Sequence, residues 1–410
     1  MQDTAQNYPS NQRLAAGETR WICERAASLG FTLCGVAPAE SFPELARYPE
    51  WLERGYAGEM RYLSDPRRFA VQHALPNVRS LIVCALNYNS PLPYSTEANA
   101  PEADSLNAGA SSGPRAWISR YAWGDDYHEL LWAKLNALAA ELKVRHGAAI
   151  EARAYADTGP IHERLGAKYA GLGWVGKNTL LINQSAGSWL FLGVILTSLS
   201  LTPSLGPNDS PPADRCGTCR ACLDACPTQA IVEPYLMDAS RCIAYLTIEL
   251  RGSIPENLRE PMGRHVFGCD ICQDVCPWNR KSPRTTAAEF QPRTFSPVSA
   301  PAGNAADRRE PSLFLADLLW LANLTEDQFR QYFSGSPIKR TKWRGLMRNA
   351  CIALGNTRLN PASVSFGDAL RTLAALSSSS DPVISESARW AIARIQPTGH
   401  PAERIQPAAG

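Results

Sequence analysis

The chain has 410 residues, of which 45% are hydrophobic, and its formal net charge at pH 7 is +2. A chain of this length forms two or three domains with their own buried cores, so it is not a small scaffold held together by disulfides. The nearly balanced charge excludes a molecule that is basic all over, so any nucleic-acid-binding surface has to be a local patch.

The sequence shows no segment that targets the chain to a membrane. Its beginning, "MQDTAQNYPSNQR", lacks an apolar core, and its longest apolar run, "WLFLGVILTSLSL" from Trp189, is too short and too rich in Ser and Thr to span a bilayer. We therefore expect a soluble, cytoplasmic protein that does not bind a membrane. In that reducing compartment the twelve cysteines are expected to be metal ligands or catalytic thiols rather than disulfides.

The first half of the chain alternates helical and strand patterns. A helix that ends at Gly30 is followed by the strands "FTLCGVAP" and "SLIVCALNY". Residues 90–115 lack periodicity and predict a long surface loop. A helix over 126–146 has a leucine stripe for burial, and after it come the strand "IEARAYAD", a short helix from Pro160, and the strands "NTLLI" and "SWLFLGVILT". These elements predict one α/β or α+β domain over residues 1–205.

Two proline-rich stretches divide the rest of the chain. "LTPSLGPNDSPPADR" breaks the pattern before a run of cysteines, and a second such stretch leads into a helical end. In that end, "TEDQ" from Thr325 is a capping box, and Asp381-Pro382 marks another helix start. Two apolar stripes at helical spacing predict stacked helical hairpins of the repeat kind. The predicted parts are a cysteine-rich domain over 206–281, a linker over 282–311, an all-α HEAT-like repeat domain over 312–397 and a tail over 398–410.

Four cysteines and a proline fall within "CGTCRACLDACP". Their spacing, C-x2-C-x2-C-x3-C-P, is that of bacterial ferredoxins, in which three thiolates bind one [4Fe–4S] cluster and the fourth binds another. A second motif, C-x2-C-x3-C-P, begins at Cys269, and Cys242 stands between the two motifs. The sequence therefore predicts a bacterial ferredoxin-like domain with two clusters. Crosswise sharing assigns Cys216, Cys219, Cys222 and Cys276 to the first cluster, and Cys226, Cys242, Cys269 and Cys272 to the second.

Zinc is the alternative metal for such thiols. Zinc sites use pairs of ligands separated by a longer loop, so that four side chains can surround one ion as a tetrahedron. Four cysteines in eleven residues, followed by proline, fit this poorly, and we favour iron–sulfur clusters. The other four cysteines lie on apolar faces of predicted elements and are expected in the core; they are Cys23, Cys34, Cys84 and Cys351.

Two further stretches resemble ligand-binding motifs. "GLGWVGKN" from Gly171 satisfies G-x-G-x-x-G, but nucleotide-binding loops follow a strand and open a helix, whereas here a helix precedes and a strand follows. A glycine turn that approaches a planar cofactor stays an alternative. Asp157 follows a strand and precedes Pro160, so it is either a ligand-facing acid at the carboxyl end of a strand in an open sheet or a helix N-cap. An acid that protonates a leaving oxygen needs a pKa raised by burial.

The chain resembles the epoxyqueuosine reductase family in six blocks, which span most of the chain from residue 17 onward. They are "SRYAWGDDYH", "DTGPIHERLGAKYAGLGWVGKNT", "CGTCRACLDACPTQAI", "RCIAYLTIE", "GCDICQDVCPWN" and "SPIKRTKWRGLMRNACIALGN". The resemblance implies an enzyme that reduces the epoxide of epoxyqueuosine to the alkene of queuosine at the wobble position of tRNA, the last step of queuosine biosynthesis. It also implies a cobalamin-binding domain, whose cobalamin the two [4Fe–4S] clusters supply with electrons.

The resemblance also implies roles for individual residues. Asp157 matches the family's proton donor, which protonates the epoxide oxygen as the C–O bond breaks. The D-x-H-x-x-G pattern of a histidine ligand to cobalt is absent, since Asp126-Tyr-His128 lacks the glycine, and this fits the base-off cobalamin of the family. We expect a monomer that receives electrons from an external one-electron reductant. The implied cofactor contacts are Ser119, Arg120, Tyr121, Asp157, Gly176, Lys177, Asn178 and Thr179.

A basic segment offers the local patch that tRNA binding needs. Residues 328–367 contain no acidic residue, and arginines recur at i, i+4 and i+8 on a helix predicted from Lys339. The alternative to a tRNA-binding surface is a solvated charged face, although such faces usually carry both positive and negative side chains. The predicted tRNA contacts, made to phosphates, are Lys339, Arg340, Lys342, Arg344 and Arg348.

Two other functions stay open on the sequence. A corrinoid iron–sulfur reductive dehalogenase shares the cofactors, but such enzymes usually carry an export signal and have no helical repeat domain. A non-enzymatic electron-transfer subunit would use the helical end to dock another protein. Bound corrin in the purified protein distinguishes this subunit from the two enzymes.

Overall fold

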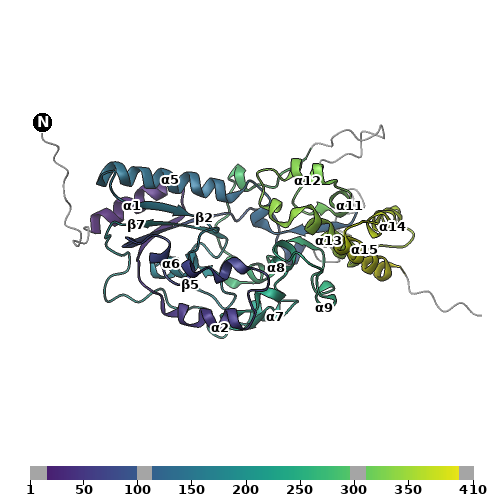
Figure 1. The fold of residues 1–410 in the computed structure, drawn as a ribbon, viewed down its shortest axis with the longest axis horizontal. Coiled ribbons are helices and arrows are strands. Elements are labelled where there is room, and N and C mark those ends of the chain that lie inside the picture. Colours follow the sequence, from purple (N-terminus) through teal and green to yellow (C-terminus); the bar gives the residue numbers. More distant parts are fainter. Residues whose placement is uncertain (1–15, 99–112, 296–310, 397–410) are drawn as a thin grey trace, which may run out of the picture.

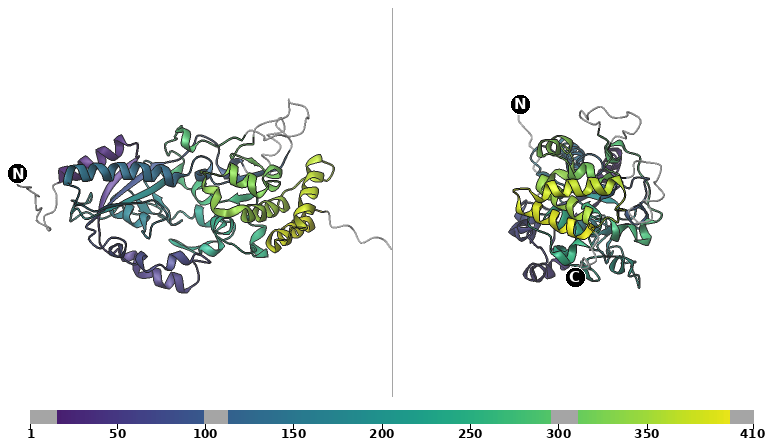
Figure 2. Two further views of the ribbon diagram at one scale, coloured as in Figure 1. Left: turned by 45° about the horizontal axis from the view of Figure 1, so that its top comes forward. Right: turned by 90° about the vertical axis from the view of Figure 1, so that its right-hand side faces the viewer.

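The computed structural model describes residues 16–98, 113–295 and 311–396. The predicted tail, half of the predicted linker and part of the predicted loop over 90–115 lie outside these ranges. The described parts form an elongated molecule (Figure 1). An N-terminal sheet lies at one end, the C-terminal helices lie at the other, and the cysteine-bearing segments lie between them, as the turned views also show (Figure 2).

The N-terminal part is built on a four-stranded sheet in the order β1-β2-β7-β4. All three strand pairs are antiparallel, and β2 and β7 pair over their whole lengths. This part is therefore α+β. The expectation that Asp157 lies at the carboxyl edge of an open α/β sheet is wrong, because neighbouring antiparallel strands end at opposite edges. The strands are β1 (Leu33–Pro38), β2 (Ser80–Asn87), β4 (Ala152–Tyr155) and β7 (Leu190–Thr197).

Helices cover both faces of this sheet. Strand β2 is buried along its whole length, and its alternate residues point to opposite faces. Ile82 and Cys84 pack with α1 (Ala16–Ser28) and α5 (Tyr127–His146), whereas Leu81 and Val83 pack with α6 (Glu163–Tyr169). The predicted first helix and the helix over 126–146 are confirmed, but the helix expected from Pro160 begins three residues later, at Glu163.

Shorter elements complete the N-terminal part. Helix α3 (Ser95–Ala98) interrupts the predicted surface loop, and the two-residue strands β5 (Trp174–Val175) and β6 (Leu181–Ile182) form a small hairpin after α6. Helix α2 (Tyr48–Glu53) lies on the same side of the sheet as α6 (Figure 1). Of the four cysteines expected in the core, Cys84 and Cys351 are buried, whereas Cys23 and Cys34 are half-buried.

Each cysteine motif forms a loop followed by a single helical turn. In the first motif the turn is α7 (Ala221–Asp224), in the second it is α10 (Ile271–Asp274), and the two turns contact each other. The motifs are therefore side by side although about fifty residues separate them in the sequence. The segments between them are β8 (Ile231–Glu233), β9 (Leu236–Met237), α8 (Ile243–Ile248), α9 (Glu256–Arg259) and β10 (His265–Phe267).

A three-stranded sheet in the order β10-β3-β11 joins the three parts of the chain. Strand β3 (Arg115–Ile118) belongs to the predicted N-terminal domain, β10 to the cysteine region, and β11 (Ala316–Asp317) to the C-terminal part. One hydrophobic core contains Trp117, Phe267 and residues of the C-terminal helices. The three parts thus share buried contacts, and the domain boundaries stay a prediction.

The C-terminal part is helical after Asp317, but the prediction of an all-α domain over 312–397 is wrong at its start, where β11 pairs with β3. The capping box at Thr325 is formed, and the Asp381 carboxylate caps the helix that starts at Pro382. Both predicted apolar stripes are largely buried, since α13 packs against α11 and α15, and α15 packs against α14. The helices are α11 (Leu318–Ala322), α12 (Glu326–Tyr332), α13 (Lys342–Gly355), α14 (Val364–Ser377) and α15 (Pro382–Ile395).

Candidate functional site

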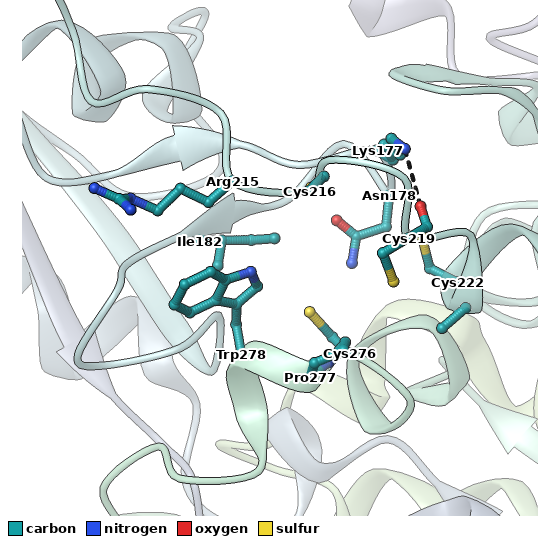
Figure 3. Close-up of a pocket in the computed structure, with 11 residues that line it drawn as sticks. Lys177, Asn178, Ile182, Arg215, Cys216, Cys219, Cys222, Cys276, Pro277 and Trp278 are labelled. Atoms are coloured by element: carbon teal, nitrogen blue, oxygen red, sulfur yellow. Dashed lines mark hydrogen bonds between the residues drawn. The ribbon is translucent and has the colours of Figure 1, made fainter.

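Four cysteines from the two motifs line one cavity of about 260 Å³ (Figure 3). Cys216, Cys219 and Cys222 come from the first motif, and Cys276 reaches the cavity from the second. Among the residues that the structure describes, no three Cys, His, Asp or Glu side chains converge closely enough to hold a single ion. A cavity of this volume, lined by four thiols, suits a multi-atom cluster.

The eight cysteines predicted as cluster ligands fall into two sets by proximity. Burial raises the pKa of Cys222 to about 11, and the negative charges of Cys276, Cys216 and Cys219 raise it further. Burial is also the largest cause of the raised pKa of Cys272. The negative charges of Cys242 and Cys226 raise this pKa further, and that of Cys222 follows. The charge of Cys222 acts on Cys272, so the two sets lie next to each other. The sets are Cys216, Cys219, Cys222 and Cys276, and Cys226, Cys242, Cys269 and Cys272.

The glycine-rich turn contacts the cysteine loops. Lys177 donates to the carbonyl oxygens of Gly217, at 2.5 Å, and Cys219, at 2.9 Å, and the Asn178 amide donates to the carbonyl oxygen of Cys272 at 3.2 Å. Helix α6 precedes this stretch, β5 lies within it and β6 follows it, so it does not open a helix as a phosphate-binding loop does. Lys177 and Asn178 hold the two motifs in place, which sequence reasoning missed when it assigned them to a cofactor.

Two tryptophans beside the first set of thiols were also not predicted. The rings of Trp174 and Trp278 meet edge to face at 5.1 Å, and both pack with Cys276 and Cys216. Trp278 lines the cavity directly (Figure 3). These rings limit the access of water to the thiols. The position of Trp278 directly after a Cys-Pro pair was the available signal.

Asp157 lies beyond the end of β4, on a turn with a left-handed backbone conformation (φ +56°). Its side chain is 65% exposed, and its Oδ2 accepts a hydrogen bond from the Tyr127 hydroxyl at 2.8 Å. The N-cap of α6 is His162, which makes no side-chain capping bond. The alternative role of Asp157 as a helix N-cap is therefore wrong, and its carboxylate is accessible to a ligand.

The charge state of Asp157 depends on its neighbours. Desolvation acts to raise its pKa, but hydrogen bonds from His128 and Tyr127 and the positive charges of His128 and Arg340 outweigh it, so the pKa lies below its ordinary value. The expectation that burial raises this pKa is therefore wrong for the structure as it stands. Asp157 is a carboxylate at neutral pH here, and it has to gain a proton before it can donate one.

His128 connects two carboxylates, and neither it nor Asp126 was predicted as a site residue. Its Nε2 lies 3.3 Å from Oδ2 of Asp157, and its Nδ1 lies 2.6 Å from Oδ1 of Asp126. Desolvation acts to lower the pKa of His128, but the hydrogen bonds to Asp126 and Asp157 outweigh it and raise the pKa to about 9. Lys339 pairs with the other oxygen of Asp126 at 2.7 Å. The block "GDDYH" contained the only sequence signal for this chain of contacts.

Three predicted cofactor contacts lie on the turn after β3. The Ser119 hydroxyl donates to Asp270, and the backbone N–H of Arg120 donates to the same carboxylate at 2.8 Å. The Arg120 guanidinium is buried and donates to the carbonyl oxygens of Ser90, Leu92 and Pro93. Ser119 and Arg120 therefore position the second cysteine motif. Tyr121 is half-buried and lies near Asp157, whose charge contributes to its raised pKa after desolvation.

The remaining predicted cofactor contacts shape the glycine-rich turn. A side chain at Gly176 would lie 2.4 Å from the Cδ1 atom of Ile182, so the space beside this glycine is filled by the protein itself. Thr179 has a left-handed backbone (φ +63°), and its carbonyl oxygen accepts from Arg164 at 2.5 Å. The cofactor contacts expected at these two residues stay a prediction.

The predicted basic ridge is wrong in two respects. Residues 337–341 form a 3-10 helix, and α13 begins only at Lys342, so the arginines do not share one continuous helix. Arg348 is 1% exposed and donates to the carbonyl oxygens of Leu246, Leu250 and Gly252, because this part of α13 faces the cysteine region. Arg348 is therefore not available to a phosphate.

The other basic residues of this segment have acidic partners elsewhere in the fold. Arg340 pairs with Glu249 at 3.0 Å, and Arg344 pairs with Asp381 at 2.6 Å. Both side chains keep more than two fifths of their surface accessible, and Lys342 is exposed. The Arg340 guanidinium also lies over the ring of Tyr62, which is 44% exposed. A smaller, partly neutralised basic surface remains at Lys339, Arg340, Lys342 and Arg344.

Within the described ranges, no helix combines the length and the apolar composition that crossing a membrane requires.

Two family models match parts of the chain. The model described as "4Fe-4S double cluster binding domain" matches residues 215–279, which contain all eight predicted ligand cysteines. The model described as "Epoxyqueuosine reductase QueG, DUF1730" matches residues 68–158, which end one residue after Asp157. The fold and the paired thiol sets therefore define a double-cluster iron–sulfur protein.

Comparison with whole proteins identifies the family within this class. The epoxyqueuosine reductase of Gloeobacter violaceus is 42% identical over 342 residues, covering 82% of this chain and 95% of the relative. The epoxyqueuosine reductase of Escherichia coli is 37% identical over 369 residues, which cover 89% of this chain and 86% of the relative. A solved epoxyqueuosine reductase with an epoxyqueuosine-modified tRNA-Tyr stem loop has a TM-score of 0.74 at 28% identity. The match covers 92% of this chain and 90% of the solved chain. The chain belongs to the epoxyqueuosine reductase family.

Proposed function

We propose that the chain is an epoxyqueuosine reductase, which converts epoxyqueuosine to queuosine at the wobble position of tRNA with cobalamin and two [4Fe–4S] clusters. Family membership supports this proposal and disfavours the two alternatives, a reductive dehalogenase and an electron-transfer subunit. One observation carries the proposal. The same molecule contains two adjacent sets of four thiols and an accessible carboxylate, that of Asp157, which Tyr127 and His128 contact.

The first cluster is held by Cys216, Cys219, Cys222 and Cys276, and the second by Cys226, Cys242, Cys269 and Cys272. The cavity between the first four thiols supports this assignment, since its lining carries the ligand type that iron–sulfur clusters use. Bound iron would hold these ligands as thiolates, because the metal stabilises the deprotonated sulfur. Adjacent clusters carry single electrons from an external reductant toward the cofactor.

The surroundings of Asp157 fit a cobalamin that takes no histidine ligand from this site. Both ring nitrogens of His128 contact carboxylates, so neither is free to bind cobalt. Tyr121 and Tyr127 offer aromatic surface beside the accessible carboxylate, as a large planar cofactor requires. When bound, cobalamin supplies the strongly reducing centre that no side chain provides.

Asp157 acts on the oxygen of the epoxide. Breaking a C–O bond leaves negative charge on that oxygen, and a carboxyl group within hydrogen-bond reach removes this charge by giving up its proton. Tyr127 orients the carboxyl group through the hydrogen bond to Oδ2, which leaves Oδ1 for the substrate. A solved Bacillus subtilis epoxyqueuosine reductase, 28% identical with a TM-score of 0.73, has its aspartate catalytic loop swung out of the active site. A mobile loop of this kind would carry Asp157 here.

The basic surface at Lys339, Arg340, Lys342 and Arg344 contacts tRNA phosphates, and the helices behind it form a HEAT-like repeat. Arg340 supports this placement because its charge acts on Asp157, so the surface lies beside the proposed active site. Phosphate contacts position the tRNA without reading its sequence. The modified base has to leave the anticodon stack to reach Asp157.

Metal and corrin analysis of anaerobically purified protein tests the proposed cofactors. We expect close to eight iron atoms for each chain, which two [4Fe–4S] clusters require, and a corrin absorption band beyond the broad iron–sulfur band. Protein with full iron content that takes up no cobalamin under these conditions would contradict the enzyme and favour an electron-transfer subunit.

A further inference from the structure

Reduction of an epoxide to an alkene consumes two protons. The oxygen leaves as water, so the balance for each turnover is one epoxide, two electrons and two protons. Asp157 carries one proton at most, and in this structure it is a carboxylate. A second acid therefore has to protonate the oxygen directly or return a proton to Asp157 between the two transfers.

His128 is placed to be this second acid. Its Nε2 faces Oδ2 of Asp157, and its Nδ1 faces Oδ1 of Asp126, at 3.3 and 2.6 Å. A neutral imidazole has one N–H and can donate to one carboxylate only, whereas an imidazolium donates to both. The two carboxylates therefore stabilise the doubly protonated ring, which holds a transferable proton on Nε2.

The groups around His128 keep its ring in this orientation. Asp126 is 4% exposed, accepts from the backbone N–H of His128, and pairs with Lys339 from the C-terminal part. The rings of Tyr127 and Trp132 pack against the imidazole, with centroids at 4.1 and 5.9 Å. The His128 side chain keeps 18% of its surface accessible, so solvent can return a proton to it.

The charged groups on the far side of Asp157 complete this environment. Arg340 favours the Asp157 carboxylate, and the charge of Asp157 in turn contributes, after burial, to a pKa of about 8 for Glu163. Lys339 and Arg340 come from the C-terminal part, Glu163 from α6, and Asp126 from the N-cap of α5. The His128–Asp157 pair thus lies where the N-terminal and C-terminal parts meet.

We infer that His128 is the proton relay that recharges Asp157, and that Asp126 is its positioning residue. The cycle starts with Asp157 as a carboxylate and His128 as an imidazolium. Nε2 of His128 passes its proton to Oδ2 of Asp157, and the neutral ring keeps the Nδ1 proton that faces Asp126. The Asp157 carboxyl group then turns to present this proton, gives it to the substrate oxygen and becomes a carboxylate again, while His128 takes up a proton from solvent. A second round of the same transfers delivers the second proton, and the oxygen leaves as water. This inference rests on the proposed function.

The pH dependence of turnover tests the relay in the complete, cofactor-loaded enzyme. We expect wild-type turnover to fall as the pH rises through about 9, where His128 loses its proton. Asp126→Asn should move this fall to lower pH, because one of the two carboxylates that favour the imidazolium is gone. His128→Asn should lower turnover by about 100-fold or more, the usual range for a lost proton-transfer group. His73→Asn, at an exposed histidine outside this site, is the matched control and should keep the wild-type turnover and pH profile.

A second readout does not depend on activity. Titration of the histidine ring signals by NMR, assigned with His128→Asn, gives the midpoint of His128 in wild-type protein and in Asp126→Asn. We expect a midpoint well above 6.5 that falls in the variant. A wild-type midpoint near 6.5, or a His128→Asn enzyme with normal turnover and pH profile, would overturn the relay. Wild-type protein that does not reduce epoxyqueuosine at all would instead overturn the proposed function, while the NMR titration would still decide on the relay's geometry.

Discussion

The ammonium group of Lys177 lies 2.5 Å from the carbonyl oxygen of Gly217, and this contact ties the glycine-rich turn to the first cysteine motif. Lys177 also donates to the carbonyl oxygen of Cys219 and is 9% exposed, so the lysine side chain itself is largely shielded from water. The lysine thus acts on the shape of the loop that presents the thiols. Its place in a phosphate-loop-like sequence does not reflect phosphate binding.

Lys177→Met should weaken the first cluster. The variant leaves two carbonyl oxygens without their donor, so the loop that carries Cys216, Cys219 and Cys222 loses its support. Loss of such supporting contacts typically lowers metal affinity by about 10- to 100-fold. Iron release to a chelator measures the effect, with Lys281→Met at an exposed lysine as the control. Equal release from both variants would show that Lys177 does not support the cluster.

Cys226→Ser should damage the cluster that the second motif holds, not the one beside it in the sequence. Cys226 contributes to the raised pKa of Cys272 and is therefore close to that thiol. We expect iron content to fall by about half and one of two EPR signals to be lost. Cys219→Ser should remove the other signal, and Cys23→Ser, outside the motifs, should remove neither. Loss of the same signal in Cys226→Ser and Cys219→Ser would reject the crosswise assignment.

Local features of this chain were predictable because they depend on residues close together in the sequence. The capping box at Thr325 and the cap at Asp381 involve contacts within three residues. The spacing of the cysteine motifs likewise predicted loops that present several thiols together. The sheet direction was not predictable in this way, since whether β2 pairs parallel or antiparallel with β7 depends on the path of the chain between them.

Arg348→Met should destabilise the fold. The buried guanidinium donates to three carbonyl oxygens of the cysteine region, and methionine leaves them unpaired in the interior. We expect a loss on the order of 3 kcal/mol in the free energy of unfolding. Thermal unfolding of anaerobic protein measures this loss, with Arg358→Met at an exposed arginine as the control. An unchanged unfolding midpoint for Arg348→Met would mean that these bonds contribute little.

Lys342→Ala/Arg344→Ala should weaken tRNA binding without changing iron or corrin content. Each lost phosphate contact lowers the slope of log affinity against log salt by about one. Lys143→Ala, at the opposite end of α5 from His128, is the matched control. Binding titrations at several salt concentrations give both quantities. An unchanged affinity and salt slope in the double variant would place the tRNA contact elsewhere.

Tertiary partners explain why the basic segment and the acid site could not be derived from sequence. Residues 328–367 contain no acid, yet Lys339, Arg340 and Arg344 pair with carboxylates from three distant segments. Asp157 and His128 are 29 residues apart and meet only because α5 and β4 pack against each other. The contact with His128 helps to lower the pKa of Asp157, whereas an argument from burial alone predicts a raised pKa.

Anaerobic turnover of tRNA that contains epoxyqueuosine tests the central proposal most directly. Wild-type protein loaded with cobalamin and given a chemical reductant should convert the modified base to queuosine, which mass spectrometry detects as the loss of one oxygen atom. Asp157→Asn should bind the same tRNA and cofactors but lose turnover by about 100-fold or more, since the amide cannot supply the proton. Normal conversion by Asp157→Asn, or no conversion by fully loaded wild-type protein, would contradict this account.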